Sequence, residues 1–110
     1  MRDDRLYLIH MSESIETIVA YTSEGREAFM ASKLIQDAVI RNFEVLGEAA
    51  KHVSDAFKAE HPELPWKQVA GFRDVLIHDY MGVDLERIWA GIEGDLPPLR
   101  ASLTSILSKD

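Results

Sequence analysis

The sequence predicts an all-α protein, an antiparallel bundle of four to five helices with one long second helix. Apolar residues recur in steps of three and four along nearly all of the 110 residues, which is the spacing of one face of an α-helix. No segment alternates between apolar and polar residues for long enough to indicate a strand. The length suits one hydrophobic core, so residues 1–110 are interpreted as a single domain.

Two apolar stripes define the first half of the bundle. The first predicts a helix of about 18 residues that ends near Gly25, with apolar positions Leu8, Met11, Ile15, Ile18 and Thr22. The second predicts one helix from near Glu27 to near Ala59, with apolar positions Ile35, Val39, Phe43, Leu46, Ala50, Val53 and Phe57. Such a helix is roughly 45–50 Å long. Because that exceeds the core of so small a protein, part of it is expected to pack against another molecule.

Prolines and one aspartate delimit the second half. Pro62 and Pro65 end the long helix, because proline disfavours helix at the residue before it, and Pro65 suits the first turn of a third helix. The apolar positions of this third helix are Trp66, Val69, Phe72, Leu76 and Ile77. Residues 81–83 are expected to form a turn, and Asp84 is a typical N-cap for a fourth helix. Pro97 and Pro98 either kink that helix or begin a fifth segment.

The composition excludes several classes of protein. The chain has no cysteine, and therefore no disulfide framework and no thiolate zinc site. It has neither a signal-peptide pattern nor the roughly 18 apolar residues of a membrane span, so the expected location is the cytoplasm, away from membranes. The net charge of −7 argues against a broad phosphate-binding surface. Since the charge is −3 over residues 1–25, zero over 26–73 and −4 over 74–110, any contact with nucleic acid should be local.

Three of the four histidines have an ordinary structural explanation. His10 lies beside apolar residues of the first helix, His52 follows Glu48 by four positions as in a helical pair, and His61 precedes Pro62 where a cap is expected. No two histidines have the i, i+4 spacing of a helical metal site. We therefore expect neither a metal nor another cofactor.

The fourth histidine lies in a cluster of polar residues at positions 72–80. On a helix, Arg73 and Tyr80 share one face, whereas His78 is about 140° from Arg73 around the axis. A kink near Tyr80 or a second chain is needed to bring the three together. From the residues alone, the cluster is either a functional site or a hydrogen-bonded network at the end of a helix.

The spacing Arg-x4-His-x-Tyr, formed by Arg73, His78 and Tyr80, resembles the signature of the HEPN superfamily of small helical ribonucleases. Further elements resemble its HepT-like branch, which contains toxins of toxin–antitoxin pairs: residues 37–50, His61-Pro62, Pro65-Trp66, and Val83-Asp84-Leu85 with Trp89. The resemblance covers the chain from near Leu6 to near Leu107. One departure is Asp74, where asparagine is common in the family.

The resemblance implies a metal-independent endoribonuclease, the toxin of a type VII-like toxin–antitoxin pair. His78 would take the proton of a ribose 2′-OH, and Arg73 would stabilise the phosphorane, which leaves a 2′,3′-cyclic phosphate. The resemblance also implies a homodimer that joins two motifs in one cleft. The implied antitoxin is an MNT-type nucleotidyltransferase that adds AMP to Tyr80, where the group would block the cleft and repel RNA.

Residues of the second helix belong to the same hypothesis. Asp74, Arg41 and Glu48 are candidates for support of the motif, although on the residues alone Arg41, Glu44 and Glu48 form a solvated ion-pair ladder. Gly47 in mid-helix indicates the close approach of another helix. The aromatic residues are expected in the core rather than against RNA bases: Trp66, Phe72 and Trp89.

A non-catalytic function is the alternative. In that interpretation the chain is a helical dimer module that binds a nucleotidyltransferase, and the motif is retained for structure. The acidic net charge favours this alternative, whereas the complete set of Arg73, His78 and Tyr80 favours the ribonuclease.

Overall fold

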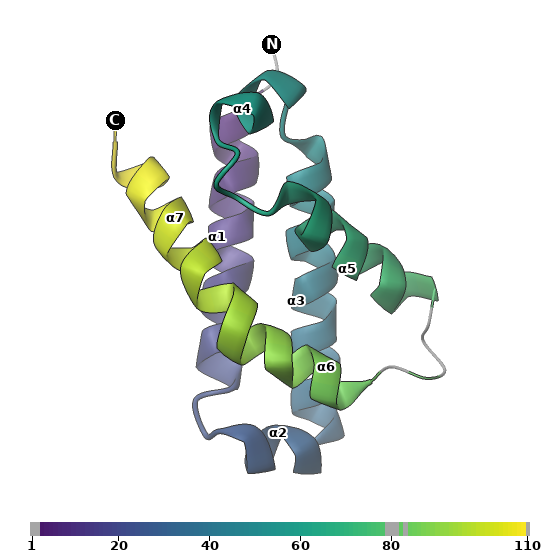
Figure 1. The fold of residues 1–110 in the computed structure, drawn as a ribbon. Helices are drawn as coiled ribbons and strands as arrows, with labels where there is room; N and C mark the ends of the chain where they lie inside the picture. Colours follow the sequence, from purple (N-terminus) through teal and green to yellow (C-terminus); the bar gives the residue numbers. More distant parts are fainter. Residues whose placement is uncertain (1–2, 79–81, 83, 110) are drawn as a thin grey trace.

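The chain folds into helices, as the sequence predicts. The computed structural model describes residues 3–78, 82 and 84–109, and these residues contain no strand (Figure 1). The elements are α1 (Asp4–Tyr21), α2 (Arg26–Ala31), α3 (Lys33–His52), α4 (Asp55–Glu60), α5 (Trp66–His78), α6 (Leu85–Ala90), the π-helical segment η1 (Gly91–Asp95) and α7 (Leu96–Ser108). The all-α prediction is confirmed. Of the turn predicted at residues 81–83, Met81 and Val83 lie outside the described residues.

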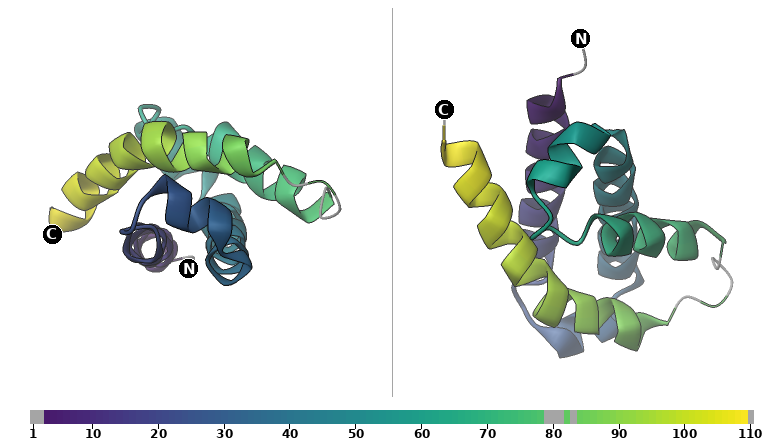
Figure 2. Two further views of the ribbon diagram at one scale, coloured as in Figure 1. Left: turned by 90° about the horizontal axis from the view of Figure 1, so that it is seen from below. Right: turned by 45° about the horizontal axis from the view of Figure 1, so that its top comes forward.

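The helices form two layers. α1 and α3 lie side by side and antiparallel, and α2 connects them at one end (Figure 1). α6, η1 and α7 follow one another across one side of this pair, as the view from below shows (Figure 2). α5 packs against α3, and its C-terminal end projects beyond α3 in both figures.

The predicted helix from Glu27 to Ala59 is divided into three helices, and the single-helix interpretation is wrong. Ser32 has an extended backbone, and its side-chain oxygen accepts a hydrogen bond from the Ile35 amide at 3.1 Å, so a new helix begins there. Ser54 caps α4 in the same way, through the Phe57 amide at 3.1 Å. The side chain of Asp4 accepts bonds from both the amide and the hydroxyl of Ser54, at 2.9 and 2.6 Å.

The apolar stripe of the predicted second helix is still buried, although the helix is interrupted. Its buried members are Val39, Phe43, Leu46, Ala50 and Val53. α3, with 20 residues, is the longest helix among the described residues and spans about 30 Å. That length fits within a small domain. The length of α3 therefore gives no reason to expect that another molecule packs against it.

The remaining boundaries follow the predicted chemistry. Gly25 has φ of 96° in the turn before α2, a conformation that a side chain would strain. Asp84 caps α6, and its carboxylate accepts bonds from the amides of Glu86 and Arg87 at 3.0 and 3.3 Å. Pro97 and Pro98 lie in the first turn of α7, and the π-helical segment η1 joins α7 to α6 without a non-helical break, since Gly91, Asp95 and Leu96 all have helical backbone angles.

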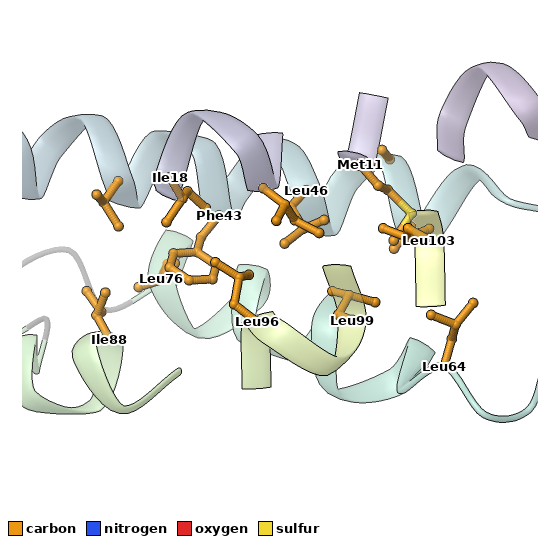
Figure 3. Close-up of a cluster of buried hydrophobic side chains, with 14 of the residues drawn as sticks. Met11, Ile18, Phe43, Leu46, Leu64, Leu76, Ile88, Leu96, Leu99 and Leu103 are labelled. Atoms are coloured by element: carbon orange, nitrogen blue, oxygen red, sulfur yellow. The ribbon is translucent and has the colours of Figure 1, made fainter. Parts of the chain in front are cut away.

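One continuous core lies between the two layers (Figure 3). α1 contributes Met11 and Ile18, α3 contributes Phe43 and Leu46, and α7 contributes Leu103, all of them buried. The Phe72 ring packs edge-on against Phe43 with ring centroids 5.0 Å apart, and Trp89 is buried beside Phe29. Among the described residues, no helix is both long and apolar enough to cross a membrane.

Candidate active site around Arg73

α5, the helix that contains Arg73 and His78 of the motif, is held at its first residue by a hydrogen bond from a tryptophan side chain. α5 begins directly after Pro65, and the Trp66 indole N–H donates to the carbonyl oxygen of His61 at 2.9 Å. His61 also ends α4, because its amide bonds to the carbonyls of Phe57 and Lys58, so the capping role predicted for it is confirmed. These hydrogen bonds fix the first turn of α5 relative to the end of α4, and from there α5 crosses α3.

The crossing of α3 and α5 depends on Gly47. A Cβ atom at this position would lie 2.3 Å from the Cβ of Arg73 and 3.1 Å from the carbonyl oxygen of Val69. Only glycine permits so close an approach, and the prediction that another helix approaches Gly47 is confirmed. The crossing holds the first part of the Arg73 side chain directly against the backbone of α3.

Two carboxylates hold the Arg73 guanidinium. Nη2 lies 3.0 Å from Oε1 of Glu48 on α3, and Nη1 lies 3.2 Å from Oδ1 of Asp74, its neighbour on α5. The side chain is 24% exposed, and among the described residues its buried Nε–H has no hydrogen-bond partner. Because guanidinium has five N–H donors, these contacts fix its plane and leave further donors for an acceptor.

Asp74 also contacts α3. The Lys51 ammonium donates to Oδ1 of Asp74 at 2.7 Å. This hydrogen bond lowers the pKa of the Asp74 carboxyl below its ordinary value, against a smaller opposing effect of desolvation, and the bond from Arg73 lowers it further. The carboxylate therefore stays charged and joins the two cations across the helix crossing.

Beyond Glu48, the site continues into a cleft of about 290 Å³ between α1 and α3, which we term the α1–α3 cleft. Nδ1 of His52 lies 2.9 Å from the backbone carbonyl oxygen of Glu48 and 3.6 Å from its second carboxylate oxygen, so the predicted helical pair of these residues is confirmed. The Tyr7 ring stacks on His52. The polar lining comes from Tyr7 and His10 of α1, Arg41, Glu44, Glu48 and His52 of α3, and Arg73 of α5.

The predicted site residues divide into three groups. Arg73, Asp74 and Glu48 are in direct contact. Arg41 lines the α1–α3 cleft, and its guanidinium lies 3.8 Å from the Glu44 carboxylate rather than in the Arg73 cluster. The backbone of His78 forms the C-terminal end of α5, and Tyr80 lies outside the described residues.

Sequence reasoning missed Lys51 and Tyr7. Lys51 follows Gly47 by four positions, so it shares the face of α3 that α5 approaches, and this spacing was an available signal. Tyr7 belongs to another helix, and nothing local connects it with His52. In the described part of the chain, no group of three or more histidine, aspartate or glutamate side chains is placed to hold a metal ion.

The fold and the site define a class: small helical proteins in which one helix carries an arginine and ends, five positions later, at a histidine. The chain belongs to the family described as Ribonuclease HepT-like, which matches residues 11–106. The HepT-like resemblance predicted from the motif is therefore confirmed, and membership supports an RNA-cleaving role.

Relatives in archaea agree with this assignment. The chain is 41% identical over 106 residues to a Thermococcus cleftensis protein named "Probable ribonuclease HepT", with 96% of each chain covered. It is also 41% identical over 109 residues to a Methanocaldococcus jannaschii protein named "Gamma-glutamylcyclotransferase and putative RNase". That match covers 98% of this chain and 49% of the relative, so the chain spans about half of that protein. No solved structure gave a significant match.

Proposed function

We propose that this protein is a metal-independent endoribonuclease in which Arg73 and His78 cleave RNA. One observation carries the proposal: Glu48 and Asp74 fix the Arg73 guanidinium on the helix whose C-terminal end is His78. Family membership supplies the class of substrate. A cation held by two carboxylates is already oriented, so little reorganisation is needed when charge develops on a phosphate.

The proposed reaction is an internal transfer at one phosphodiester. The His78 imidazole takes the proton of the ribose 2′-OH, and the 2′ oxygen attacks the adjacent phosphorus. The bond from phosphorus to the 5′ oxygen breaks, the leaving oxygen takes up a proton, and a 2′,3′-cyclic phosphate remains. Arg73 stabilises the extra negative charge of the phosphorane through donors that Glu48 and Asp74 leave available.

A homodimer is part of the proposal. Positions 73 and 78 lie on one α-helix, about 140° apart around its axis and about 7.5 Å apart along it. In addition, the C-terminal end of α5 projects beyond α3 (Figures 1 and 2). A two-fold axis near this end would pair Arg73 of one protomer with His78 of its partner. Light scattering should give twice 12.4 kDa at micromolar concentration, and a stable monomer would contradict the dimer.

Regulation by a partner completes the proposed function. The HepT-like resemblance favours the toxin of a type VII-like toxin–antitoxin pair, in which an MNT-type nucleotidyltransferase transfers AMP to the Tyr80 hydroxyl. The transferred phosphate would compete with RNA for Arg73, and the adenosine would occupy space that the substrate needs.

The test is RNA cleavage by the purified chain in EDTA. Arg73→Lys keeps the charge but loses the planar fork, so we expect a large loss of rate. Arg100→Lys is the matched control, because Arg100 makes a comparable two-point pair with Glu16, at 2.7 and 2.8 Å, outside the site.

Each outcome of this assay has a defined meaning. Loss in Arg73→Lys and retention in Arg100→Lys support the proposal. Complete inhibition of the parent protein by EDTA contradicts a metal-free reaction. No cleavage by the parent, together with stable binding of the nucleotidyltransferase, would favour the non-catalytic dimer module instead.

A further inference from the structure

The α1–α3 cleft has the size of a small-ligand site. Its volume of about 290 Å³ lies at the lower edge of the roughly 300–1,000 Å³ typical of ligand pockets. That space suits one nucleotide rather than a longer segment. Arg73 lines one side of the cleft, so whatever binds there lies next to the proposed reaction centre.

Three side-chain rings line the cleft and offer a surface on which a base could stack. The centroids of the Tyr7 and His52 rings are 5.2 Å apart with their planes at 30°, and His10 meets Tyr7 edge-on at 6.4 Å. Single-stranded RNA is commonly bound through unstacked bases that stack on aromatic and histidine rings. A paired duplex cannot offer a base in this way.

The charges in the cleft favour a base inside and phosphates at the rim. Glu44 and Glu48 both line the cleft and would repel a phosphate placed between them. By contrast, the Arg41 side chain is 73% exposed, and the 3.8 Å separation from Glu44 is too long for a hydrogen bond. Arg41 is therefore a cation at the edge of the cleft, with donors that can bind a phosphate oxygen.

From this arrangement we infer that the α1–α3 cleft is a nucleobase subsite, in which Tyr7, His10 and His52 bind one unstacked base of single-stranded RNA and Arg41 binds a flanking phosphate. The inference rests on the proposed function, since it takes RNA as the substrate. It adds a binding role for α1, which carries no part of the Arg73–Tyr80 motif.

Binding is measured with a probe that the protein cannot cut. A short fluorescein-labelled RNA of mixed sequence, fully 2′-O-methylated, lacks the attacking hydroxyl, so its fluorescence anisotropy reports affinity alone. Tyr7→Leu removes the ring but keeps apolar volume at a partly buried position that packs against the core. We expect about tenfold weaker binding, the scale of one lost base stack.

Matched variants separate stacking from folding. Tyr21→Leu makes the same change near the other end of α1, where Tyr21 is 48% exposed and outside the cleft, and it should bind like the parent. Tyr7→Phe keeps the ring and should also bind like the parent. His10→Ala, at an exposed position, should weaken binding without lowering the melting temperature. Arg41→Gln should reduce the slope of log affinity against log salt by about one.

The outcomes distinguish this inference from the proposed function. Equal affinities for Tyr7→Leu and Tyr21→Leu, failure of the parent to bind the probe, or equal binding of the probe as a duplex would each overturn the subsite. If cleavage of ordinary RNA is intact in such a case, the ribonuclease proposal survives alone. If Tyr7→Leu weakens binding but the parent never cuts RNA, the subsite stands and the ribonuclease proposal fails.

Discussion

Replacing Gly47 with alanine should destabilise the protein, although alanine is the better helix former. The added methyl group would lie 2.3 Å from the Cβ of Arg73 and 3.1 Å from the Val69 carbonyl oxygen. Neither atom can rotate away, because one is attached directly to the backbone and the other belongs to it. α3 and α5 must therefore separate by about 1 Å to restore the ordinary contact distance of 3.4 Å.

The net change in stability is the cost of overpacking minus the gain in helix propensity. Overpacking of a tight contact costs typically about 1–3 kcal/mol, and exchange of glycine for alanine inside a helix returns about 1 kcal/mol. Since the clash involves backbone-bound atoms, we expect a value near the upper end, a net loss of about 2 kcal/mol. For a domain of this size the melting temperature should fall by about 8 °C.

Gly71→Ala is the matched control on the facing helix. A Cβ at Gly71 has nothing within 4 Å, so this variant gains helix propensity without a clash. It should be more stable than the parent by up to about 1 kcal/mol. Thermal unfolding of the three proteins is followed by circular dichroism at one protein concentration, because dimerisation would make the midpoint depend on concentration. If Gly47→Ala melts at or above the parent temperature, the close crossing of α3 and α5 is wrong.

Three further predictions concern the motif and its surroundings. His78→Ala should lower the rate of RNA cleavage by roughly 10²–10⁴, the usual contribution of a general base, whereas His61→Ala should leave it unchanged; equal rates for His78→Ala and the parent would remove His78 from the mechanism. The Asp74 pKa is lowered chiefly by Lys51, so its contribution to stability is present above the unfolded value of about 3.9 and is lost as the pH falls further, through the folded value. In an NMR titration the Asp74 pKa should therefore rise in Lys51→Met, and no change would refute the pairing. Co-expression with an MNT-type nucleotidyltransferase, the partner proposed above, should increase the intact mass by AMP units that map to Tyr80, and modification at another residue would refute that assignment.

Much of the fold could be predicted from local patterns in the sequence. The stripe from Leu8 to Ile18 is buried as predicted, and the stripe from Val39 to Val53 is buried even though the helix ends within it. Apolar periodicity reports which face a residue occupies, and it is insensitive to a single capping residue. For that reason it merged α2, α3 and α4, whose boundaries depend on the side chains of Ser32 and Ser54.

The candidate site was predictable only where its residues are neighbours in the chain. Arg73, Asp74 and His78 lie within six positions of one helix, so the motif could be read from local spacing, and together with the further elements along the chain it predicted the family. Gly47 indicated that a second helix comes close, because glycine is costly in mid-helix unless space is needed. The sequence could not say that the approaching helix is the motif helix itself.

The tertiary structure alone decided which distant residues meet. Lys51 reaches Asp74 across 23 positions, Asp4 reaches Ser54 across 50, and Tyr7 stacks on His52 from a different helix. Such contacts depend on the angle and depth at which helices cross, which follow from the packing of whole side-chain surfaces rather than from any local repeat. The sequence by itself therefore determined the all-α class, the buried faces and the motif. The crossing at Gly47 decided that Glu48 and Asp74 hold Arg73, and the pairing of α1 with α3 placed three rings beside it.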